Sequence, residues 1–168
     1  RERGLAEVRR GRALSAADQT AGALAAFETA KGLVPQIGDW IAIFAAEASA
    51  RAGDTARVRA YLDEADPTLA REWGWSLRVR ALMNANDLAG AEQAASAAAN
   101  ELQDASRRAD AWRTLGDLRL MRSDQEGART AFRRAMAARE TSPAALDAAR
   151  KLSDLPGLTP EEQLRIGR

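Results

Sequence analysis

The side chains of this chain that could do chemistry are carboxylates, arginines and tryptophans, because histidine and cysteine are both absent. Without an imidazole or a thiol, Ser-His triads, Cys-His dyads and zinc sites are excluded. Glu47 and Glu72 lie near tryptophans, but a glycosidic general acid needs a closed cleft and a raised pKa. Each is better explained as a surface or groove charge. Neither lysine follows a glycine-rich phosphate loop, so we predict no catalytic residue, cofactor or metal here.

The charge pattern does not indicate a polyanionic partner, since the formal net charge is only +1. Arginines are concentrated at the start of the chain: Arg1, Arg3, Arg9, Arg10 and Arg12. Glu2 and Glu7 interrupt this cluster, and no aromatic side chain lies nearby to stack on a base. We therefore expect no nucleic-acid partner. The longest apolar runs, such as residues 41–46, are too short for membrane insertion.

Composition predicts that helices position these side chains. The chain is rich in alanine, the best helix former, and poor in β-branched residues and in proline. Turn residues at 35–38, 53–54, 66–67, 86–87 and 123–124 separate the helical segments. The expected helices are about 3–17, 20–33, 38–52, 55–64, 67–85, 88–104, 106–122, 125–139 and 142–153, with a further start after Thr159.

One stretch carries a recognisable hairpin pattern. Its positions are Trp112, Leu115 and Gly116 on one helix, then Ala128, Phe132 and Ala135 on the next. Gly116 would let the two helices approach closely, and Phe132 would fill the space between them. The pattern resembles the tetratricopeptide (TPR) repeat, W-x2-L-G followed by A-x3-F-x2-A.

The same template fits upstream with less regular residues. The positions equivalent to Phe132 are Phe27, Leu62 and Ala95, which gives spacings of 35, 33 and 37 residues along the chain. The predicted repeats are about 4–37, 39–72, 72–105 and 109–142, with a partial repeat at 143–168. This resemblance implies one all-α, TPR-like α–α superhelix, a solenoid of antiparallel helix hairpins covering the chain. Exposed repeat ends would allow a homodimer.

In TPR proteins the first helix of each hairpin lines a concave groove. The resemblance therefore implies these ligand-binding candidates: Trp40, Glu47, Arg51, Trp73, Arg80, Asn84, Arg113 and Asp117, with Ile43, Ser76, Leu120 and Met121 beside them. Aromatic and arginine side chains supply contact energy at binding surfaces. The alternative is that Trp40, Trp73 and Trp75 are core between repeats and that the arginines are solvated. Trp112 occupies the core position of the template itself.

Some TPR co-chaperones grip a partner's C-terminal carboxylate with lysine, asparagine and arginine. This sequence departs from that pattern where lysine and asparagine would be expected, at Val8, Arg12, Trp40, Ile43 and Glu47. Binding of a chaperone tail is therefore disfavoured.

A narrower resemblance rests on the run at 38–46, on Gly53-Asp54, Trp75 and Arg80-Ala81, and on the segments 87–91 and 158–168. These are similar to the N-terminal superhelical region of soluble lytic murein transglycosylases. That family's catalytic Glu-Ser pair is absent here. The resemblance therefore implies the non-catalytic part of such an enzyme, which would position peptidoglycan strands in the periplasm or cell envelope.

Two functions remain open at this point. The first is the superhelical region of a peptidoglycan lytic transglycosylase, and the alternative is a TPR adaptor that binds a peptide in its groove. Both are non-catalytic binding or scaffolding modules. The chain starts at Arg1 rather than at methionine, so we expect it to be part of a longer protein, and the transglycosylase resemblance implies a bacterial one. Its location in the cell is not indicated by the residues themselves.

Overall fold

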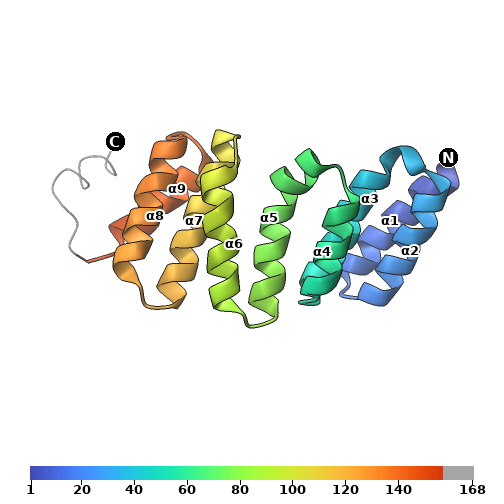
Figure 1. Cartoon of the computed structure of the whole chain (residues 1–168), viewed down its shortest axis with the longest axis horizontal. Helices are drawn as coiled ribbons and strands as arrows, with labels where there is room; N and C mark the ends of the chain where they lie inside the picture. Colours follow the sequence, from blue (N-terminus) through green and yellow to red (C-terminus); the bar gives the residue numbers. More distant parts are fainter. Residues whose placement is uncertain (157–168) are drawn as a thin grey trace. The chain divides into compact units, whose positions relative to one another are not determined.

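The computed structural model describes residues 1–156, which are all-α, with no strand in that range (Figure 1). The α-helices are α1 (Glu2–Ala16), α2 (Thr20–Leu33), α3 (Gly38–Arg51), α4 (Thr55–Glu64), α5 (Pro67–Asn84), α6 (Leu88–Glu101), α7 (Ala105–Met121), α8 (Gln125–Ala138) and α9 (Pro143–Ser153), and Pro35–Ile37 form a short 3-10 helix, η1. The all-α prediction is confirmed. The helix expected after Thr159, and with it the end of the partial repeat, lies outside the described residues.

The chain divides into two compact units, Arg1–Ala91 and Glu92–Arg168, and the division falls within α6. In unit 1, α3 packs against all four of α1, α2, α4 and α5. In the described part of unit 2, α7, α8 and α9 pack against one another. Glu92 of α6 also forms ion pairs with Arg119 and Arg122 of α7.

The turns that join α1 to α2, α3 to α4, α5 to α6, and α7 to α8 share one geometry. Each contains one residue with a positive φ: Asp18 (56°), Gly53 (71°), Asn86 (60°) and Ser123 (63°). The next residue donates its backbone N–H to the carbonyl five positions earlier, over 2.8–3.0 Å, which is the Schellman pattern of helix ends. Each positive-φ residue precedes the Phe132-equivalent position of its own hairpin by nine residues. The pairs are 18 and 27, 53 and 62, 86 and 95, and 123 and 132.

Three of these turns also start the following helix. Asp54, Asp87 and Asp124 each accept a hydrogen bond from the backbone N–H three residues later, over 2.8–2.9 Å. Such a cap satisfies one of the free donors at a helix N-terminus. One short segment, a left-handed residue followed by aspartate, thus ends one helix and begins the next.

The close approach of α7 and α8 depends on Gly116. A Cβ placed at this position would come within 2.3 Å of the Phe132 ring, and Phe132 is fully buried. Unit 1 repeats the arrangement, because a Cβ at Gly11 would come within 2.5 Å of the Phe27 ring. The predicted role of Gly116 is therefore confirmed. Trp112 is 8% exposed, which agrees with its expected place in the core.

Two local features differ from the expected elements. The helix expected over 88–104 ends at Glu101, because Asp104 is the N-cap of α7 and accepts a hydrogen bond from the Arg107 N–H over 2.9 Å. Leu102 is left in the connection, where its side chain is 1% exposed. The turn at Pro35 contains η1, whose first position suits the fixed φ of proline. No helix within residues 1–156 is long and apolar enough to cross a bilayer.

Candidate functional site

Two tryptophans form an exposed aromatic contact in unit 1, which we call the tryptophan pair. Trp40 lies in the first turn of α3, and Trp73 lies in α5. Their ring centroids are 5.9 Å apart, and the rings meet edge to face at 66°, a favourable geometry for aromatic side chains. Trp40 remains 41% exposed and Trp73 45%. Much of both indole surfaces therefore stays available for contact with another molecule.

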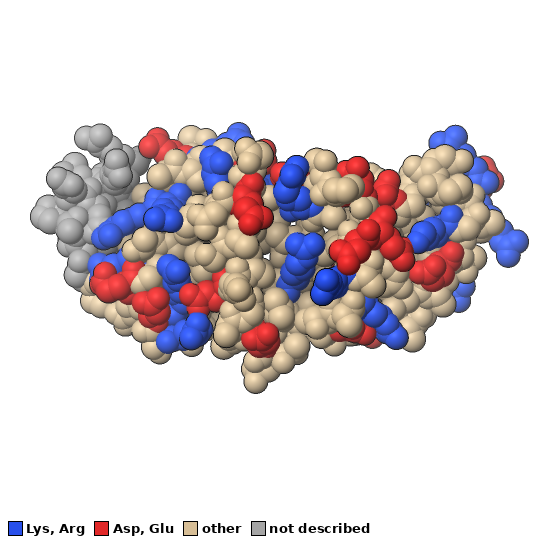
Figure 2. Space-filling view, in the orientation of Figure 1, with Lys and Arg blue, Asp and Glu red and all other residues tan. Residues whose placement is uncertain are grey.

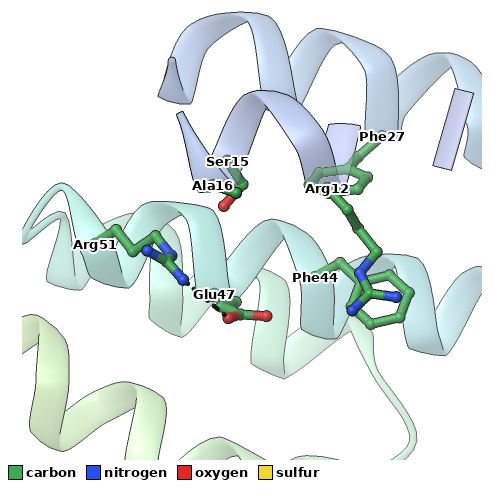
Figure 3. A pocket seen from close by; sticks show the side chains of 7 residues that line it. All are labelled: Arg12, Ser15, Ala16, Phe27, Phe44, Glu47 and Arg51. Carbon is green, nitrogen blue, oxygen red and sulfur yellow. Dashed lines mark ion pairs between the residues drawn. The ribbon is translucent and has the colours of Figure 1, made fainter. Parts of the chain in front are cut away.

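A small pocket lies among the helices of unit 1 (Figure 3). Its volume is about 120 Å³, and its lining comes from α1, α2 and α3. The lining residues are Arg12, Ser15, Ala16, Phe27, Phe44, Glu47 and Arg51. The pocket lining therefore combines phenylalanine rings with charged side chains.

Arg12 is held over the face of an aromatic ring. Its guanidinium carbon lies 5.1 Å from the centroid of the Phe44 ring, a cation–π distance, and Figure 3 shows the two groups stacked. Phe44 lies 6.2 Å from the buried Phe27 ring. Phe44 thus connects the core residue Phe27 to the surface residue Arg12.

Glu47 is the carboxylate of this region and is flanked by two arginines. Its Oε1 lies 3.7 Å from Arg51 in the same helix and 3.8 Å from Arg80 of α5. All three side chains are 39–47% exposed, so water screens these pairs and each contributes little to stability. Two neighbouring cations are the opposite of the apolar surroundings that a carboxylic general acid needs.

Asn84, another groove candidate, is bound to backbone. Its Nδ2 donates to the carbonyl of Ala50 over 2.9 Å and to that of Arg51 over 3.1 Å. These are among the last carbonyls of α3, which have no partner within the helix. Asn84 therefore satisfies the end of α3 and links it to the end of α5.

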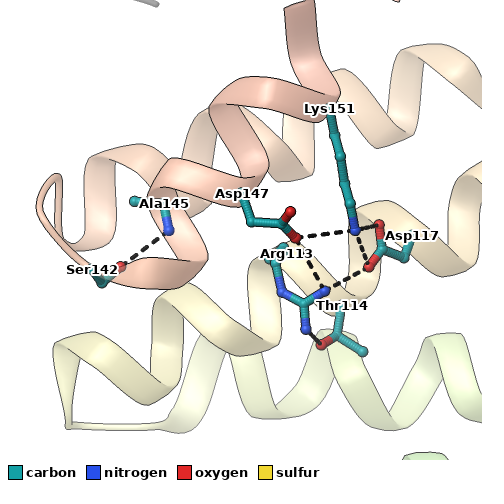
Figure 4. A network of polar contacts seen from close by, with 7 residues as sticks. All are labelled: Arg113, Thr114, Asp117, Ser142, Ala145, Asp147 and Lys151. Carbon is teal, nitrogen blue, oxygen red and sulfur yellow. Dashed lines mark hydrogen bonds and ion pairs between the residues drawn. The ribbon is translucent and has the colours of Figure 1, made fainter. Parts of the chain in front are cut away.

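The two candidates in unit 2, Arg113 and Asp117, belong to a closed ion-pair network between α7 and α9 (Figure 4). Arg113 lies 2.8 Å from Asp117 and 3.5 Å from Asp147. Lys151 lies 2.7 Å from Asp117 and 3.1 Å from Asp147. Two cations and two carboxylates balance, and each contacts both groups of opposite charge. The geometry ties α9 to α7 and leaves no net charge for a ligand.

Asp110, one turn before Arg113, gives a pH-dependent prediction. Burial raises the pKa of its carboxyl, although Arg113 acts in the opposite direction. A raised folded-state pKa means that stability falls as the pH rises through the ordinary aspartate range. We expect Asp110→Asn to raise the free energy of unfolding at pH 7 and to have no effect near about pH 3, where aspartate is protonated in both states.

Urea unfolding followed by circular dichroism at the two pH values measures this effect. Asp63→Asn is the control, because the Asp63 side chain is 65% exposed and its replacement should change little at either pH. An Asp110→Asn variant that is less stable at pH 7 would contradict the prediction.

Charges of both signs are mixed on the face drawn in Figure 2, and no extended region of one sign is visible there. This distribution agrees with the formal net charge of +1 and differs from the basic stripe of nucleic-acid-binding surfaces. Within residues 1–156, no group of three or more acidic side chains is placed to hold a metal ion.

Sequence reasoning did not select Arg12 and Phe44 as site residues. Arg12 follows Gly11, whose contact with Phe27 fixes the buried side of α1, and Phe44 comes one helical turn after Trp40. Helical periodicity could have placed both on one surface. Their contact, however, joins two hairpins and depends on how α1 packs against α3.

No protein-family model matches the chain, and a search of curated proteins finds no match. The TPR and transglycosylase resemblances therefore rest on the residues quoted above.

Proposed function

We propose that this chain is a non-catalytic helical-repeat module that binds an extended peptide segment of a partner protein on unit 1. The observation that carries the proposal is the tryptophan pair, two large aromatic side chains that contact each other yet remain 41% and 45% exposed. Exposed aromatic clusters of this kind mark interaction surfaces. The four equivalent turns support a TPR-like repeat as the scaffold.

A second candidate is the superhelical region of a lytic transglycosylase. The same tryptophan pair favours it, because flat indole faces also pack on sugar rings. In that case the binding partner would be a peptidoglycan strand, and the protein would act in the cell envelope. The peptide-binding function has the broader support, since the charged pocket of the same unit provides polar groups for a peptide.

Binding measurements on tryptophan variants test the proposal. We expect Trp40→Ala and Trp73→Ala each to weaken binding to a library of ten-residue peptides at least tenfold, because each removes about half of the aromatic surface. Fluorescence anisotropy gives the affinities, and circular dichroism checks helix content. Leu146→Ala is the matched control, since Leu146 is also exposed, at 56%, but lies in α9 of unit 2.

Pull-down with purified peptidoglycan separates the two candidates. Binding to peptidoglycan alone, lost in both tryptophan variants, would replace the peptide proposal with the transglycosylase one. A sharp loss of helix content in Trp40→Ala would show that the pair is structural, and the proposal would fail.

A further inference from the structure

The pocket region of unit 1 carries more positive than negative charge. Arg12 and Arg51 line the pocket, and the lining carboxylate, Glu47, pairs with Arg51 and with Arg80 of α5. Among residues 1–156, no carboxylate lies within ion-pair distance of Arg12, whose structural contact is with the Phe44 ring. In unit 2, by contrast, the network of Arg113 with Asp117, Asp147 and Lys151 has equal numbers of positive and negative groups. The pocket region therefore has a local excess of positive charge, within a chain whose formal net charge is +1.

The stacking of Arg12 leaves its hydrogen-bonding groups available. A cation–π contact uses the flat face of the guanidinium, whereas its five N–H donors point outward in the plane. The Phe44 ring also restrains the long side chain, so less conformational freedom is lost when an acceptor binds. A carboxylate matches this planar fork, because its two oxygens can accept two parallel hydrogen bonds.

Helix geometry gives an approximate separation between the tryptophan pair and this arginine. Trp40 precedes Phe44 by four residues in α3, which is about 6 Å along the helix axis. Arg12 reaches Phe44 from α1, and neighbouring packed helices lie roughly 8–10 Å apart. The indole surface and the guanidinium are thus on the order of 6–12 Å apart, the length of about two to four residues of extended peptide.

We propose that unit 1 binds an extended acidic segment of a partner protein. A glutamate or aspartate side chain of that segment accepts hydrogen bonds from the Arg12 guanidinium. A bulky apolar side chain, two to four residues away, packs on Trp40 and Trp73. This inference rests on the peptide-binding function proposed above and specifies its ligand. The proposed binding uses an acidic side chain within the partner segment and does not require a free C-terminus. It is therefore distinct from the recognition of C-terminal carboxylates.

Fluorescein-labelled, C-terminally amidated peptides test the charge requirement. Each probe has one tryptophan and one glutamate in a Gly/Ser background, separated by two, three or four positions and placed in both orders. A second set carries glutamine in place of glutamate, and a third carries lysine. Anisotropy titrations at about 150 mM salt should show that at least one glutamate probe binds tenfold tighter than its glutamine counterpart, with lysine probes weakest. Raising the salt should reduce this preference.

The Arg12→Gln variant assigns the preference to Arg12. It should bind glutamate and glutamine probes alike, while its affinity for glutamine probes stays within twofold of the original. Arg12→Lys should restore part of the preference, because it keeps the charge but loses the planar fork. Arg59→Gln is the matched control: it removes the same charge from α4, where the side chain is 83% exposed, and should leave the preference unchanged.

The outcomes separate this inference from the proposed function. Equal binding of glutamate and glutamine probes, or tighter binding of lysine probes, overturns the acidic ligand but leaves peptide binding intact. If no probe binds, and the peptide library does not bind at the same concentrations either, the acidic ligand and the peptide-binding function are both overturned. The comparison of glutamate with glutamine on the unsubstituted chain needs no variant, so it decides the question even if Arg12→Gln is poorly folded.

Discussion

Replacing Gly116 with leucine is expected to lower the free energy of unfolding of unit 2 by about 3 kcal/mol. A Cβ alone would approach the Phe132 ring to 2.3 Å, and Phe132 is fully buried, so neither the ring nor the new side chain has room to move. The helices α7 and α8 would have to separate, which would also weaken the packing of Trp112. Urea unfolding followed by far-ultraviolet circular dichroism measures the loss.

Gly32→Leu is the control for this substitution. Gly32 lies in the last turns of α2, and nothing stands within 4 Å of a Cβ built there. Leucine has a higher helix propensity than glycine, so the control should be neutral or slightly stabilising, by up to about 1 kcal/mol. Equal effects at both positions would mean that close helix packing does not require glycine at 116.

Replacing Phe27 with alanine should be similarly damaging to unit 1, by about 3–5 kcal/mol. Phe27 is 1% exposed, fills the space above Gly11 and lies 6.2 Å from the Phe44 ring. The substitution would leave a cavity next to the existing pocket and would remove the support beneath Phe44 and Arg12. The same urea measurement applies, and binding of the acidic probes should weaken in parallel.

Leu33→Ala provides the comparison in the same helix. Leu33 is 41% exposed, so its truncation should change stability by less than about 1 kcal/mol. A small effect of Phe27→Ala, comparable to that of Leu33→Ala, would show that the core of unit 1 closes around the deletion.

Much of the secondary structure could be predicted because its signals are local. Aspartates at 54, 66 and 124 cap helices through hydrogen bonds spanning two or three residues, and such caps are visible in sequence. Proline at the start of α5 and α9 acts in the same way. The contact of Gly116 with Phe132 was also predictable, because both residues belong to one hairpin and their spacing matches the TPR template.

The candidate site was predicted less completely, because its contacts join different hairpins. The TPR resemblance placed Trp40 and Trp73 on the first helices of hairpins, but their mutual contact depends on how α3 packs against α5. Asn84 was selected for its position, and its bonds to the end of α3 appear only once that packing is known. Likewise, Arg113 and Asp117 have partners on α9, Asp147 and Lys151, that each lie 34 residues further along the chain.

The four positive-φ turns bear on how a chain like this can change length. Each turn satisfies its own backbone hydrogen bonds, and three of the four do so without glycine. A genetic crossover between two such turns would join the end of one helix to the start of another through the same turn geometry. The hydrogen bonds at the helix end and at the helix start would both be kept. The lengths exchanged would be 33, 35 or 37 residues, because these separate the turns at 18, 53, 86 and 123. Whole hairpins, rather than single helices, are therefore the natural units of duplication and loss in this sequence.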